Sequence, residues 1–321
     1  IYGLRWRQFS NEQTDNQQFE WVNFNPMFIT RYFEVYGDKY GPKMFFGLFT
    51  LIIFVFILII LWQLYKSNLF SKKFIFVLSL LPLFTIILQR FGTYDALPLL
   101  AMMTGVLSRG IGVAFLSAFV VVGTNPEAGL VSGLSLLLLY FACRKSEKSK
   151  ISLHGGSIRF GLAQIIFAIP TIVISSFSKD NTSNFEAILF VDSRHAIAQL
   201  LASGTILIYS WLGAIWFVLV PILCRLDRRL CIRVSFVIGF TGVATLIASD
   251  GTRNSALGLT SIVVAILTTK NGYEYILTLT KLRLFALYFM PALNVANFNI
   301  VLPFYQILYL FGFARPILVT I

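Results

Sequence analysis

Long apolar runs, separated by short polar breaks, follow one another from residue 44 almost to the C-terminus. The clearest of them cover residues 44–65, 74–88, 156–175, 196–223 and 234–248. Their length suits helices that cross a bilayer, which need roughly 20 mainly apolar residues. They lack the alternation of apolar and polar positions that marks a membrane β-strand. The pattern therefore predicts an all-α fold, a polytopic transmembrane helical bundle.

The stretch between residues 89 and 144 is broken more often than the rest of the chain. Polar breaks at residues 90–95, 108–110 and 123–127 leave two apolar pieces, and both are shorter than the roughly 20 residues of a full span. Such pieces are tolerated in a membrane only where they are buried in protein or line a cavity. We expect short or re-entrant helices here, one or two further spans within residues 285–313, and roughly ten membrane segments in all.

Basic residues predict the orientation of the bundle. The chain has 26 Lys and Arg against 14 Asp and Glu, which gives a net charge of +12. Most of these cations lie in short loops, around residues 66–73, 144–150, 225–233 and 270–283. The positive-inside rule places such loops in the cytoplasm, so the charge is explained without nucleic acid as a partner. We expect a multi-pass protein of the bacterial inner (plasma) membrane, in contact with membrane lipids.

The composition indicates the same class of protein. Charged residues make up 12% of the chain and hydrophobic residues 57%, with a mean hydropathy of +0.78, whereas a soluble domain carries roughly 25% charged residues. The three cysteines, Cys143, Cys224 and Cys231, end apolar runs beside basic loops and show no metal or redox spacing. We interpret them as ordinary small apolar residues.

Residues 1–43 differ from the apolar body. Aromatic residues, among them Trp6, Trp21 and Tyr36, are interleaved there with polar ones, whereas disordered segments are poor in aromatic residues. Trp and Tyr settle at membrane interfaces. The sequence therefore predicts an extracytoplasmic aromatic and polar segment with interfacial helices over residues 1–43, and a transmembrane helical domain over residues 44–321. The chain starts at Ile1 and has no signal-peptide core, so we expect an upstream segment, such as a first transmembrane helix.

The polar stretch Ser249–Asn254 is the most unusual feature of the apolar body, because it places an acid and a base between two apolar runs. Charges near a bilayer are costly, and they usually pair or face a polar cavity. Under the predicted topology this stretch lies outside, where other acids of the membrane body also gather. The candidate catalytic carboxylates there are Asp250, Asp95 and Glu127. They could act as general base toward an acceptor hydroxyl, or hold a divalent cation as cofactor.

Several basic residues of the outer loops lie close in sequence to these or other acids. Arginine can bind a phosphate through two hydrogen bonds, and histidine can move a proton. The candidate residues for binding a substrate phosphate are Arg253, Arg194, Arg90 and His195.

A structural interpretation of the same residues stands beside the functional one. Asp250 could cap the helix that follows it, and Asn125-Pro126-Glu127 is an ordinary helix start. The remaining charges could form ion pairs at the membrane interface. No P-loop, dinucleotide fingerprint, zinc motif or serine-hydrolase elbow occurs in the sequence.

Three short motifs between membrane helices carry a resemblance to a known family. They are an Asp-x-Thr-Arg motif at residues 250–253, Tyr94-Asp95 and Asn125-Pro126-Glu127. With these motifs, its helix number and its polar outer face, the chain resembles the GT-C type glycosyltransferases of bacterial envelopes. The resemblance implies a polyprenyl-phosphate (lipid-phosphate-linked) sugar donor and an acidic base in the first outer loop. Here that loop would be residues 1–43, where Asp38 is a candidate base.

Two other functions fit the same pattern. A transporter or lipid flippase would place its site at broken helices near the membrane midplane, here around Arg109 and Pro126. A non-catalytic membrane subunit of a larger complex would use the aromatic residues of segment 1–43 for docking.

Overall fold

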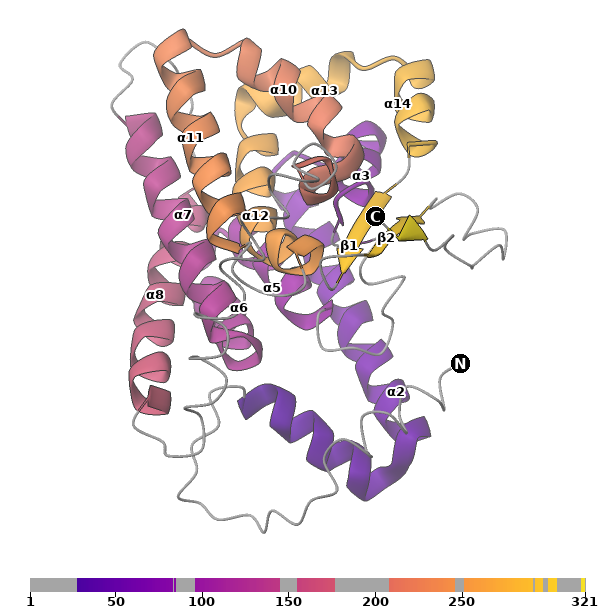
Figure 1. The fold of residues 1–321 in the computed structure, drawn as a ribbon, viewed down its shortest axis with the longest axis vertical. Helices are drawn as coiled ribbons and strands as arrows, with labels where there is room; N and C mark the ends of the chain where they lie inside the picture. Colours follow the sequence, from indigo (N-terminus) through magenta and orange to yellow (C-terminus); the bar gives the residue numbers. More distant parts are fainter. Residues whose placement is uncertain are drawn as a thin grey trace.

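The computed structural model describes residues 28–82, 84, 96–144, 155–176, 208–245, 251–290, 292–296, 300–304 and 319–320. In these ranges the chain is mainly helical, and the helices pack into a bundle (Figure 1). The predicted helical fold is confirmed. Within the described ranges, three helices are long and apolar enough to cross a membrane: Gly47–Lys66, Pro126–Arg144 and Gly155–Ile174. They indicate a membrane protein.

Helix α2 (Phe28–Lys66) has 39 residues and contains the first candidate span. Figure 1 shows it in two limbs, one across the lower part of the molecule and one that rises along it. The glycines and proline of residues 37–42 are typical of a turn, yet these residues lie inside this helix. Pro42 is a residue that bends helices without always ending them. One side of the rising limb presents large apolar side chains to the outside: Leu51, Phe54, Leu58 and Trp62.

The predicted breaks at residues 108–110 and 123–127 separate short helices, as expected. α5 (Ala96–Leu107) and α6 (Ile111–Thr124) are apolar but shorter than the candidate spans. Every residue of α5 is buried, because α2, α6, α8 and α12 pack around it. α3 (Lys72–Ser79) is also short, and Ser71 caps it by accepting a hydrogen bond from the Phe74 amide.

Helices α7 (Pro126–Arg144) and α8 (Gly155–Ser176) are closely packed neighbours. They run in opposite directions, because Ser132 contacts Gln164 while Leu136, later in α7, lies beside Gly161, earlier in α8. A Cβ atom added to Gly133 would lie 2.8 Å from the carbonyl oxygen of Gly161. Small residues allow membrane helices to approach this closely.

The predicted run over residues 196–223 is broken in its described part. η2 (Gly213–Ile215) separates residues 208–212 from α10 (Trp216–Cys224). Gly213 has a φ of 52°, a left-handed conformation that glycine adopts without a steric penalty. α11 (Arg228–Thr245) and α12 (Gly251–Leu267) follow. α13 (Lys270–Thr278) and α14 (Lys281–Tyr288) lie with α10 at the upper end of the molecule in Figure 1.

A small sheet corrects the expectation of helical spans for residues 292–296 and 300–304, the part of that region in which the structure describes strands. β1 (Ala292–Ala296), β2 (Ile300–Phe304) and β3 (Val319–Thr320) pair antiparallel in that order. Ala292 is opposite Phe304, and Leu293 is opposite Pro303. Short apolar runs that are bounded by residues such as proline and asparagine are typical of strands. Only residues 292–302 lie between Pro291 and Pro303, which is too few for a membrane helix.

Candidate functional site

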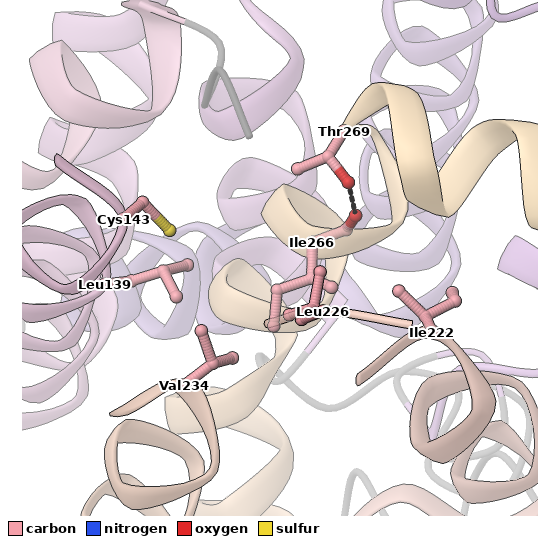
Figure 2. Close-up of a pocket in the computed structure, with 7 residues that line it drawn as sticks. All are labelled: Leu139, Cys143, Ile222, Leu226, Val234, Ile266 and Thr269. Carbon is pink, nitrogen blue, oxygen red and sulfur yellow. Dashed lines mark hydrogen bonds between the residues drawn. The ribbon is translucent and has the colours of Figure 1, made fainter. Parts of the chain in front are cut away.

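The directions of the core helices follow from contacts at two levels. The Ser132 hydroxyl oxygen in α7 lies 2.7 Å from that of Ser261 in α12. Nearer the C-terminal ends, Cys143 of α7 and Ile266 of α12 line the same small hollow (Figure 2). Because these two contacts come in the same order along both helices, α7 and α12 run parallel.

Helix α5 has the same direction. Val106, near its C-terminal end, accepts a hydrogen bond of 3.4 Å from the Ser157 hydroxyl at the start of α8. Since α8 runs opposite to α7, the C-terminal ends of α5 and α7 point toward the same end of the bundle. α12 packs against both α5 and α7. We call these three helices the parallel core.

The C-terminal ends of the parallel core lie at what we call the basic end of the molecule. Cys143, Leu226 and Thr269 all line the hollow in Figure 2. Leu226 lies between α10 and α11, and Thr269 precedes α13. At this end the Arg225 guanidinium lies 4.6 Å from the centre of the Tyr275 ring. The contacts of these segments bring together cations that are distant in sequence: Arg144, Arg225, Arg228, Arg229 and Lys270.

The N-terminal ends of the parallel core lie at the opposite end, and each begins beside a predicted catalytic acid. Glu127 is the second residue of α7. α5 begins at Ala96 and α12 at Gly251, which directly follow Asp95 and Asp250 in the sequence. Asp95 and Asp250 themselves lie outside the described residues.

The starts of α7 and α12 also lie at similar heights in the bundle. At a helical rise of about 1.5 Å per residue, Ser132 stands about 9 Å from Pro126 along α7, and Ser261 about 15 Å from Gly251 along α12. Measured from the contact between the two serines, the two helix starts differ in height by about 6 Å. We call this end of the parallel core the acidic end.

The carboxylate of Glu127 is not used to cap α7. Asn125 supplies the cap, because its side-chain oxygen accepts a 2.9 Å hydrogen bond from the Ala128 amide. Glu127 is exposed, and no cation of the described residues forms an ion pair with it. Among the described residues, nothing therefore occupies its carboxylate, which can serve a ligand at the acidic end.

The other predicted site residues are described in part or not at all. Asp38 lies in α2 and Arg253 in the first turn of α12, with only their backbones described. Outside the described residues lie Arg90, Arg194 and His195. Among the described residues, no group of three or more His, Cys, Asp or Glu could hold a metal ion.

Arg109 lies in the turn between α5 and α6. Its carbonyl oxygen accepts a 3.2 Å hydrogen bond from the Arg159 side chain of α8. A methyl group added at Gly156 would overlap the carbonyl oxygen of Ser108, so the start of α8 packs directly on this turn. The side chains of Arg109 and Arg159 are both exposed.

Sequence reasoning missed a buried polar cluster, which we call the polar seam. Besides its contact with Ser261, the Ser132 hydroxyl oxygen lies 3.3 Å from the Gln164 side-chain oxygen. The Thr241 hydroxyl oxygen lies 2.7 Å from that of Ser135. All five residues are buried. Hydrogen bonds between membrane helices contribute about 0.6 kcal/mol each on average, so the seam helps to set how α7, α8, α11 and α12 align. In the sequence, the only sign of the polar seam is the presence of isolated Ser, Thr and Gln residues within apolar runs.

The hollow at the basic end is too small for a substrate. It has room for roughly one water molecule, and its lining is almost wholly apolar. Figure 2 shows that its hydroxyl group, on Thr269, is already bonded to the carbonyl oxygen of Ile266, at 2.6 Å. Among the described residues, the acidic end is therefore the better candidate for chemistry.

Comparison with known proteins gives no family for this chain. No protein-family model, no curated protein and no solved structure matches it.

Proposed function

We propose that the chain is an integral membrane enzyme of the glycosyltransferase type that uses a lipid-phosphate-linked sugar as donor. The parallel core is the observation that carries the proposal. Its three helices begin at one end of the bundle, and each has an acid within or directly before its first turn. Arg144, Arg225, Arg228, Arg229 and Lys270 gather at the other end, so the two ends differ in their charged groups.

The orientation of the chain in the membrane is part of the same proposal. The basic end faces the cytoplasm, as the positive-inside rule requires, and the acidic end faces outward. The shorter apolar helices of the bundle join the three candidate spans in a multi-pass arrangement of roughly ten segments. The membrane is a bacterial inner membrane, whose outer face offers lipid-phosphate sugars and hydroxyl acceptors.

The reaction follows from the groups at the acidic end. One carboxylate, Asp250 or Glu127, removes the proton from an acceptor hydroxyl. The acceptor oxygen forms a bond to the anomeric carbon of the donor sugar, and the bond from that carbon to the phosphate oxygen breaks. The lipid phosphate leaves with the bonding electrons, and Arg253 neutralises its charge by bidentate hydrogen bonds. The neighbouring carboxylates place the acceptor opposite the leaving group.

The test uses the full chain in vesicles with a panel of polyprenyl-phosphate sugars and candidate acceptors. The wild type should transfer at least one sugar. Asp250→Asn should reduce that rate about 100-fold or more, the range expected for the loss of a general base. Asp227→Asn is the matched control, because Asp227 lies at the basic end. If the folded wild-type protein transfers sugar from none of the donors, the proposed glycosyltransferase activity is contradicted.

A transporter or lipid flippase is the second candidate, and Arg109 is the observation that favours it. This arginine and Arg159 are exposed beside a break between two short membrane helices, the type of place where transporters bind substrates. Transport in liposomes that Arg109→Ala abolishes and Asp250→Asn leaves intact would establish this function instead. A partner that purifies in fixed proportion, without transfer or transport, would point to a non-catalytic subunit.

A further inference from the structure

Helix α14 carries apolar side chains on two opposite faces. Leu284 and Leu287 are 8% and 6% exposed and form the inner face, which packs toward α3. The rings of Tyr288 and Phe76 lie 5.1 Å apart across this contact. One face of the helix thus packs against the protein.

The opposite face of α14 is a ridge of large apolar side chains. Leu282 is 77% exposed, Phe285 57% and Phe289 46%. They are spaced by three and four residues, so they share one side of the helix. The rings of Phe285 and Phe289 meet edge to face with 4.6 Å between their centres. Apolar groups gathered in this way mark a surface that another molecule or a membrane covers.

The charges next to the ridge are positive. Lys281 and Arg283 lie on α14 itself and are exposed. On the adjoining α3, Lys73 donates a 2.6 Å hydrogen bond to the carbonyl oxygen of Leu277. Glu274 of α13 lies nearby in the chain, but it forms an ion pair of 3.8 Å with Lys270. The described surroundings of the ridge therefore favour an anionic partner.

Aromatic residues place α14 near the level at which α2 leaves the bilayer. Trp62, Tyr65 and Phe70 are 64%, 67% and 52% exposed at the end of the α2 span. The rings of Trp62 and Tyr65 lie 6.4 Å apart, as do those of Tyr65 and Phe70. Exposed Trp and Tyr concentrate at the membrane–water interface. α3 follows directly after Phe70, and α14 packs on α3.

From these observations we infer that α14 is an interfacial helix that binds the surface of an anionic lipid leaflet. The Leu282–Phe285–Phe289 ridge enters the acyl boundary, and Lys281 and Arg283 contact lipid phosphates. An exposed apolar face flanked by cations is the pattern of helices that lie in the plane of a membrane. The inference rests on the proposed membrane orientation, and not on the proposed reaction.

The test places an environment-sensitive fluorophore on Phe285→Cys in the full chain, with Cys143, Cys224 and Cys231 replaced by alanine. The protein is reconstituted in vesicles of phosphatidylcholine with phosphatidylglycerol. Nitroxide attached to lipid should quench the fluorophore, and aqueous iodide should not. The same label on Phe54→Cys, on the exposed stripe of α2, reports whether the protein is in the bilayer. Quenching at residue 54 without quenching at residue 285 overturns the inference, whereas quenching at neither contradicts membrane insertion itself.

A second measurement tests the charge of the lipid. The nitroxide is carried on phosphatidylglycerol or on phosphatidylcholine, and the anionic lipid should quench residue 285 more strongly. The double variant Lys281→Gln, Arg283→Gln should reduce the preference for phosphatidylglycerol several-fold. Each cation near an anionic surface contributes to the attraction between the protein and the lipid. Lys270→Gln is the control, because Glu274 already balances that charge. Equal quenching by the two lipids, or iodide access to residue 285, overturns anionic lipid as the partner. Protection from both quenchers would mean that protein covers the ridge, and would also overturn it.

Discussion

The hydroxyl oxygens of Ser132 and Ser261 lie 2.7 Å apart inside the bundle and join α7 to α12. The two serines are 129 residues apart in sequence, and both are fully buried. Their contact fixes the relative height of two parallel helices, and with it the separation of the two helix starts at the acidic end. A hydrogen bond in the core thus bears on the geometry of the proposed site.

The contribution of this pair can be measured with Ser132→Ala, Ser261→Ala and the double variant. We expect each single variant to lower the free energy of unfolding in detergent by about 0.5–1.5 kcal/mol, the usual net value of one hydrogen bond. Because each change removes the same bond, the double variant should lose less than the sum. Strict additivity of the two losses would show that the serines do not interact.

The polar seam also shows where sequence reasoning stops. The apolar runs were sufficient to predict a helical bundle, and the breaks at residues 108–110 and 123–127 were sufficient to predict α5 and α6 as short helices. The partners of Ser132 and Ser135 could not be predicted, because they are 32 to 129 residues away in sequence and meet only in the folded bundle. A serine within an apolar run does not reveal its partner.

The C-terminal sheet and the break at Gly213 were missed for a different reason. Apolar runs that contain prolines or glycines fit a broken helix and a short strand almost equally well. For residues 292–304 the pairing between β1 and β2 decides in favour of strands, and this pairing depends on tertiary structure. The predicted topology already placed Asp95, Glu127 and Asp250 on one face of the membrane. The packing of α12 against α5 and α7, and the relative heights of the starts of α7 and α12, required the structure.

Two adjoining glycines at the start of α8 provide a matched test of its packing on the α5–α6 turn. A methyl group at Gly156 would meet the backbone oxygen of Ser108, which cannot rotate away, whereas Gly155 has open space around it. We expect Gly156→Ala to destabilise the protein by about 1–3 kcal/mol, as overpacking does. Gly155→Ala should stay within about 0.5 kcal/mol of wild type. Thermal unfolding in detergent measures both, and equal effects would contradict the close contact.

The cysteines test which end of the bundle faces the cytoplasm. Cys224 is exposed beside Arg225 at the basic end, whereas Cys143 is buried. In sealed cells that express single-cysteine variants, a membrane-impermeant maleimide should leave Cys224 unmodified. Permeabilisation should allow rapid modification of Cys224, while Cys143 should react only after denaturation, because its burial excludes the reagent. Labelling of Cys224 in sealed cells would reverse the proposed orientation.

The central claim is that the acidic end of the parallel core is the working face of the molecule. It is tested most directly by comparing Glu127→Gln with Glu274→Gln in the transfer assay, at equal amounts of folded protein. Both changes remove one charge and preserve the shape of the side chain, but Glu127 lies at the acidic end and Glu274 is paired with Lys270 at the basic end. We predict at least a 10-fold loss of rate for Glu127→Gln, as for removal of a group that positions or activates a reactant, and an unchanged rate for Glu274→Gln. An unchanged rate for Glu127→Gln, or a loss confined to Glu274→Gln, would contradict the claim.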